Sequence, residues 1–100
     1  MSTNRPEFNV TAPLPYEHVI FTDLDGLEGV LVDLNTKKYY QLNETASLIW
    51  RGLEKRLDLD SIAMEMTKRY DVTMAHAVSS IDAALRQFDA QRLLRPQMSP

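Results

Sequence analysis

Side chains that could carry catalysis or hold a metal ion are few in this sequence and lie far apart. The two histidines, His18 and His76, have no partner at metal-ligand spacing. No serine lies in a nucleophile-elbow sequence, and the three glycines do not form a phosphate-binding loop. Asp23 and Asp25 could share acid–base work, but Asp-x-Asp-Gly is typical of a turn with solvated acids and lacks the distal glutamate of a calcium loop. The sequence therefore predicts a protein with no catalytic residues, no metal and no cofactor.

Composition and charge limit the possible functions further. The absence of cysteine excludes disulfides, thiolate metal sites and a cysteine nucleophile. No apolar run approaches the ~20 residues that span a bilayer, and the N-terminus lacks the basic-then-apolar order of a secretion signal. We therefore expect a cytoplasmic protein without a membrane partner. The net charge of −3 argues against nucleic acid. Residues 30–57 carry five basic groups against three acidic ones, a balance that would suit an acidic peptide.

Three strands and three helices are predicted to form one domain. The expected strands span 18–22, 29–34 and 38–42, and the expected helices span 44–55, 59–70 and 74–91. Asn43, Asp58 and Thr73 precede the three helices and are expected to cap them. Residues 1–15 contain three prolines and are expected to be a mobile arm, the alternative being an edge segment packed on the domain. Residues 16–95 are expected to be the folded domain and 96–100 a tail. This order is typical of a winged-helix-like α+β domain, with a three-stranded antiparallel sheet followed by three helices.

Alternation along the strands predicts which side chains face the helices. The inward face is expected to carry Val30, Val32, Leu34, Tyr40 and Leu42. Leu31 and Tyr39 then fall on the opposite face, where they could form a cross-strand pair.

The strand at 38–42 is the main candidate for an interaction site. If it lies at the sheet edge, its outward amides and carbonyls are free. Lys37 and Lys38 are then either a device against aggregation or neighbours of a partner strand that adds to the sheet. One ring of Tyr39 and Tyr40 must point outward, either as a cross-strand stabiliser or as an interface anchor.

The third helix offers a second candidate surface. Val78 and Leu85 lie at the margin of its apolar stripe, where they are either simple core or the lining of a groove.

Two other functions use the same elements. In a DNA-binding winged-helix regulator the third helix would read the duplex, and it offers Arg86 and Arg92. It also carries Asp82 and Asp89, whose charge is unfavourable against phosphate. Alternatively, the strand at 38–42 could pair with its own copy, which would make the protein a self-pairing adaptor. The chain is thus expected to be a monomer or a homodimer.

The run at 29–50, GVLVDLNTKKYYQLNETASLIW, closely resembles the PqqD-like family of small peptide chaperones, also called RiPP recognition elements. The family pattern is an apolar strand ending in Asp, a turn, a Tyr-Tyr-x-Leu-Asn strand end and a helix with Ala and Ile-Trp. Residues 62–63, 69–72 and 81–94 resemble its later helices, so that the likeness covers about 18–95. Lys37 stands where the family often has Gly. Lasso-peptide leader-binding proteins share the same elements.

This resemblance implies a non-catalytic function in natural product biosynthesis. The family binds the leader segment of a ribosomally synthesised precursor peptide, antiparallel to the third strand and beside the third helix. It presents the peptide to a modifying enzyme, often a radical S-adenosylmethionine enzyme, or to a leader protease. On this chain the implied peptide-binding residues are Lys38, Tyr39, Tyr40, Gln41, Leu42, Val78, Ile81, Asp82 and Leu85.

Overall fold

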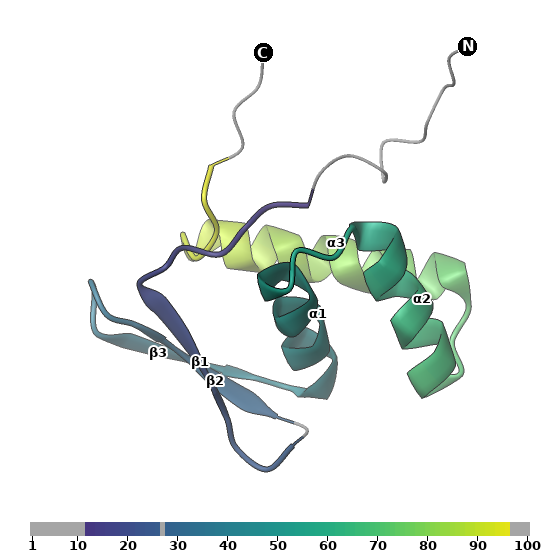
Figure 1. Ribbon diagram of the computed structural model, residues 1–100, viewed down its shortest axis with the longest axis horizontal. Coiled ribbons are helices and arrows are strands. Elements are labelled where there is room, and N and C mark those ends of the chain that lie inside the picture. Colours follow the sequence, from purple (N-terminus) through teal and green to yellow (C-terminus); the bar gives the residue numbers. More distant parts are fainter. Residues whose placement is uncertain (1–11, 27, 97–100) are drawn as a thin grey trace.

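The computed structural model describes residues 12–26 and 28–96. Its elements are β1 (Val19–Asp23), β2 (Gly29–Asp33), β3 (Lys38–Leu42), α1 (Glu44–Glu54), α2 (Leu59–Tyr70) and α3 (Met74–Ala90). The three strands form one antiparallel sheet in the order β1-β2-β3, and the helices follow it in the chain (Figure 1). The predicted α+β, winged-helix-like order is confirmed, and several element ends lie one residue away from the expected ones.

Each helix begins directly after the polar residue predicted to cap it. The amides of Ala46, Ser61 and His76 donate to the side-chain oxygens of Asn43, Asp58 and Thr73 at 2.8, 2.8 and 3.1 Å. Such caps satisfy amides that have no partner inside the helix, and each contributes about 1 kcal/mol.

The hydrophobic core lies between the sheet and the three helices. Trp50 of α1 is at its centre, fully buried, and its ring meets Phe88 of α3 edge-on at 5.1 Å between centroids. The apolar faces of the three helices supply most of the other buried side chains: Ile49, Leu53, Leu59, Ile62, Ala63, Met66, Ala77 and Ile81.

The prediction of which face β2 turns to the helices was wrong. Leu31 is fully buried and pairs with Tyr40 on the inner face. Val32 pairs with Tyr39 on the outer face, so the expected pair of Leu31 and Tyr39 does not form. Val30 lies on the outer face with Val32, and Leu34 lies beyond the strand, where 48% of it is exposed.

The length of the turn explains this error. Four residues, 34–37, connect the strands, so that Asp33 lies opposite Lys38 and every later pairing is fixed. Because β2 has apolar side chains at three consecutive positions, its sequence alone fits either face equally well. Lys37, at the end of this turn, adopts a left-handed φ of 67°, a conformation that glycine adopts most readily.

Asp33 organises the turn from a buried position. Its Oδ1 accepts hydrogen bonds from the amides of Asn35 at 2.9 Å and Thr36 at 3.1 Å. The imidazole Nε2 of His18 lies 3.6 Å from the same oxygen. Burial favours the neutral carboxyl, but the two amide hydrogen bonds and the charge of His18 outweigh it, so the pKa of Asp33 is lowered.

Asp33→Asn is expected to reduce the loss of folding stability that occurs when the pH is lowered. Because the pKa of Asp33 is lower in the folded protein, its ionised form stabilises the fold above the unfolded value of about 3.9. This contribution is lost as the pH falls through the folded value. Urea titrations at about pH 7 and about pH 3 should show a smaller drop in midpoint for Asp33→Asn than for the natural chain. Asp25→Asn, at an exposed position, is the control. Equal drops in Asp33→Asn and the natural chain would contradict this role.

The segments before β1 and after α3 pair with each other. Pro15 and Leu94 form an antiparallel bridge. It is flanked by a hydrogen bond from the Tyr16 amide to the Leu93 carbonyl at 3.1 Å and one from the Arg95 amide to the Leu14 carbonyl at 2.8 Å. Leu93 and Leu94 are buried, and so is Ala12. Residues 12–15 of the expected arm are therefore in contact with the domain, and residues 1–11 lie outside the described residues.

Within the described ranges, no helix has the length and apolar character needed to cross a membrane.

Candidate functional site

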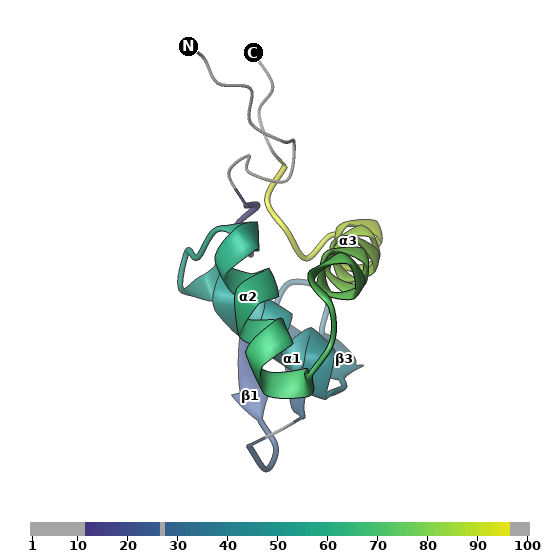
Figure 2. The same cartoon turned by 90° about the vertical axis from the view of Figure 1, so that its right-hand side faces the viewer.

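β3 forms one edge of the sheet. It pairs with β2 on one side only, as the order of the strands requires. α3 lies on the same side of the molecule as β3, with α1 between them and β1 (Figure 2). The open strand and the third helix, which the sequence singled out separately, therefore border the same side of the domain.

One hydrogen bond beside the turn between β2 and β3 fixes the direction of the backbone groups in the sheet. In a central strand, successive residues turn their amide and carbonyl alternately to one neighbour and to the other. The Leu34 amide donates to the His18 carbonyl at 2.9 Å, toward β1. Val32 and Val30 therefore also bond β1, and Leu31 between them bonds β3.

The same alternation identifies the free groups on β3. Tyr40 lies opposite Leu31 and uses its amide and carbonyl in the ladder. Tyr39 and Gln41 consequently point their amides and carbonyls away from β2, along the open edge. Outside the sheet ladders, no backbone hydrogen bond of the described residues ends on either of them. The edge thus offers two donors and two acceptors in the spacing that an added strand requires.

The α3 side of the predicted site is partly apolar. Val78 and Leu85 are half-buried and pack against the core. Ile81 is fully buried in the free domain, and Asp82 is exposed and pairs with Arg86 at 3.0 Å. Because Asp82 and Arg86 pair on the same helix, α3 does not present the unopposed positive charge that DNA favours.

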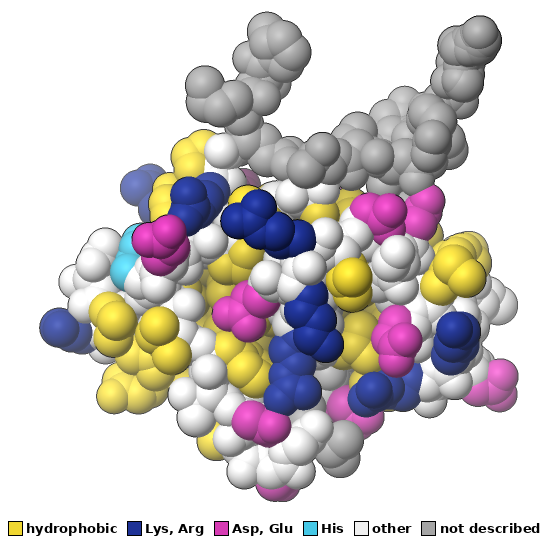
Figure 3. All heavy atoms as spheres, viewed as in Figure 1, with side chains coloured by type: hydrophobic (Ala, Val, Ile, Leu, Met, Phe, Trp, Pro, Cys, Tyr) yellow, Lys and Arg dark blue, Asp and Glu magenta, His cyan; other side chains and the backbone are white. Residues whose placement is uncertain are grey.

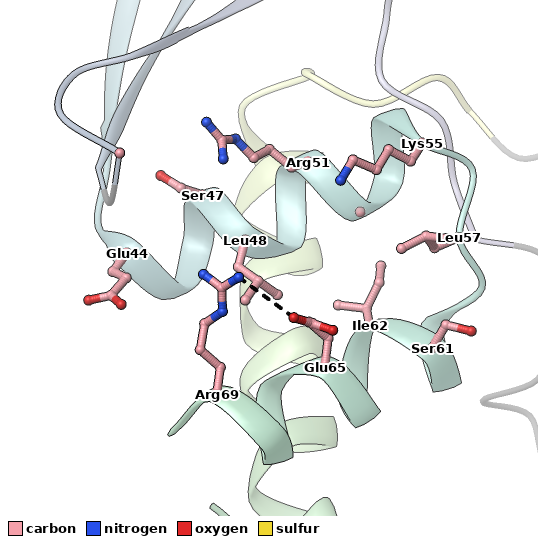
Figure 4. Close-up of a pocket in the computed structure, with 12 residues that line it drawn as sticks. Glu44, Ser47, Leu48, Arg51, Lys55, Leu57, Ser61, Ile62, Glu65 and Arg69 are labelled. Carbon is pink, nitrogen blue, oxygen red and sulfur yellow. Dashed lines mark ion pairs between the residues drawn. The ribbon is translucent and has the colours of Figure 1, made fainter. Parts of the chain in front are cut away.

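A separate pocket of about 340 Å³ lies between α1 and α2 (Figure 4). None of the predicted peptide-binding residues lines it. Polar side chains recur every four residues along its two walls: Ser47 and Arg51 on α1 with Lys55 directly after it, and Ser61, Glu65 and Arg69 on α2. This four-residue spacing of polar side chains could have indicated the pocket from the sequence. The same spacing is common on any solvated helix face.

The charges around this pocket are largely paired. The Arg51 guanidinium contacts Asp23 at 2.7 Å, and Arg69 lies 3.6 Å from Glu65. Figure 3 shows basic side chains interspersed with acidic ones on this face. The pocket therefore lacks the concentrated charge of an anion site. Among residues 12–26 and 28–96, no three His, Asp or Glu side chains are grouped to hold a metal ion.

Together, these features define a small winged-helix-like domain with an open strand edge beside its last helix. The family model described as coenzyme PQQ synthesis protein D (PqqD) matches residues 28–94. The chain belongs to this family, which confirms the resemblance seen in its sequence. No curated protein matches the chain.

Two solved structures are similar to the fold. TbiB1 in complex with the TbiA(beta) leader peptide has a TM-score of 0.77 at 24% identity, covering 86% of this chain and 99% of that chain. Lasso peptide synthetase B1 complexed with the leader peptide has a TM-score of 0.74 at 26% identity, covering 82% of this chain and 95% of that chain.

Proposed function

We propose that this protein is a non-catalytic module that holds the leader segment of a ribosomally synthesised precursor peptide by strand addition to β3. The observation that carries the proposal is the open backbone edge at Tyr39 and Gln41, on the same side of the domain as α3. Family membership supports it, and both similar structures are complexes with a leader peptide.

The backbone of β3 supplies affinity in this proposal. An antiparallel guest strand forms one pair of hydrogen bonds with Tyr39 and a second pair with Gln41. Each such bond contributes about 0.5–1.5 kcal/mol, with little dependence on the sequence of the guest. Specificity therefore has to come from side chains on the two faces of the new strand.

The side chains toward α3 form one of these two faces. Tyr40, Val78 and Leu85 are half-buried, so they can still gain apolar contact from a peptide. Leu42 and Ile81 are already buried and act as supports beneath the peptide. Lys38 and Asp82 are exposed and are available for polar contacts at its rim.

In the proposed function the leader is held while the rest of the precursor stays free for a second protein. That protein is a modifying enzyme, such as a radical S-adenosylmethionine enzyme, or a leader protease. Because precursors of this kind are made on ribosomes, we place the complex in the cytoplasm.

Isothermal titration with a candidate leader peptide tests the proposal. We expect binding, together with slower hydrogen exchange at the amides of Tyr39 and Gln41. The Tyr40 amide, already bonded to β2, is the internal control and should change least. Protection along β1 instead of β3 would contradict the proposal. Protection of β3 in the free protein that rises with concentration would indicate self-pairing.

A further inference from the structure

An apolar row crosses the face of the sheet that the helices leave open. Ile20 of β1, Val32 of β2 and Tyr39 of β3 lie opposite one another in register. Ile20 is 44% exposed and Tyr39 is 72% exposed. Figure 3 shows hydrophobic side chains gathered at the sheet end of the molecule.

The neighbouring row on the same face has a different character. Thr22, Val30 and Gln41 lie opposite one another, so this row is polar at both ends. The apolar row is therefore specific to one position along the sheet. It ends at the β3 edge with Tyr39, the most exposed of the large hydrophobic side chains in the described residues.

The position of a guest strand follows from this register. An antiparallel guest residue that takes both outward backbone groups of Tyr39 has its Cα about 5.5 Å from that of Tyr39, with its side chain on the same open face. The next guest residue points to the other face, toward α3. The residue after that bonds Gln41 and returns to the open face, beside the polar row.

We propose that the open face of the sheet reads one residue of the bound peptide, and that this residue, opposite Tyr39, is apolar or aromatic. It completes the row that begins at Ile20 and covers the exposed ring of Tyr39. The guest residue opposite Gln41 has no such row to extend and can be polar. This inference rests on the proposed strand addition and adds a specificity determinant outside the contacts with α3.

A displayed library of random peptides, long enough to span β3 and selected on the full chain, tests the inference. For one selected peptide, nuclear Overhauser effects across the new ladder identify the residues opposite Tyr39 and Gln41. Alanine at the first position should weaken binding about two- to fivefold, the range of cross-strand pairs. Alanine at the second position is the matched control and should cost less.

A double-mutant cycle then assigns the effect to the row. In Tyr39→Thr, which keeps the backbone and a strand-forming side chain, the alanine effect at the first position should disappear. Leu34→Thr, which removes an exposed apolar side chain away from the row, should leave the alanine effect intact. Equal alanine effects in Tyr39→Thr and the natural chain would overturn this inference alone, provided that the amides of Tyr39 and Gln41 are protected. Selected peptides that leave these amides unprotected would overturn the proposed function as well.

Discussion

Proline in place of Gln41 is expected to leave the domain folded and to weaken leader binding by about 1–3 kcal/mol, or about 5- to 150-fold in Kd. The Gln41 amide points away from β2, so proline removes no bond of the sheet and occupies an edge position that tolerates it. It does remove a donor to the guest strand and leaves a guest carbonyl unpaired.

Two variants separate the backbone effect from other causes. Gln41→Thr changes the side chain and keeps the amide, so the loss specific to proline is the difference between Gln41→Pro and Gln41→Thr. Tyr40→Pro breaks the ladder bond to Leu31 and should destabilise the domain itself by at least about 1–3 kcal/mol. Thermal unfolding and isothermal titration report the two effects. Unchanged peptide affinity in a folded Gln41→Pro would refute strand addition at β3.

Alanine in place of Trp50 is expected to cost about 3–5 kcal/mol of unfolding free energy. The side chain is fully buried between α1 and α3 and meets Phe88 edge-on. Removing it leaves a cavity where two helices and the sheet meet. Since a domain of this size has only about 5–15 kcal/mol of stability, the variant should unfold at a much lower urea concentration.

Trp50→Phe is the matched variant for this cavity. The indole Nε1 has no hydrogen-bond partner among the described residues, so phenylalanine removes volume without breaking a bond between them. Its cost should fall well below that of alanine, because most of the contact with Phe88 is retained. Equal urea midpoints for Trp50→Phe and Trp50→Ala would show that filled volume is not what Trp50 contributes.

The element order could be predicted because its signals are local. Asn43 and Thr73 act on amides three residues away, within the same stretch of sequence. The apolar faces of the helices likewise depend only on spacing along the chain, and Trp50 and Ile81 lie on these buried faces.

The side chains of β2 that point toward the helices could not be predicted in the same way. Val30, Leu31 and Val32 are all apolar. The sequence therefore fits a strand with Leu31 toward the helices as well as one with Val30 and Val32 toward them. Only the number of residues in the turn decides which of them meets Tyr40. The pairing of Pro15 with Leu94 is harder still, because it joins opposite ends of the described chain and has no local pattern.

For the candidate site, the sequence indicated the strand but not which of its backbone amides and carbonyls are free. The edge position of β3 follows from a hairpin that leads directly into a helix. The choice of Tyr39 and Gln41 as the outward residues needed the register of all three strands. The row from Ile20 to Tyr39 needed it too, since these residues lie on separate strands.

The bridge between Pro15 and Leu94 also determines how this domain can be combined with other polypeptides. Because the segments at the two ends of the described chain run side by side, they leave the domain at one place (Figure 1). Such a unit can be inserted into a surface loop of a host enzyme through two short linkers, or circularly permuted, without rebuilding its core. A domain joined to a host in this way would be attached through its paired end segments, and the open edge at β3 would not be part of the joint.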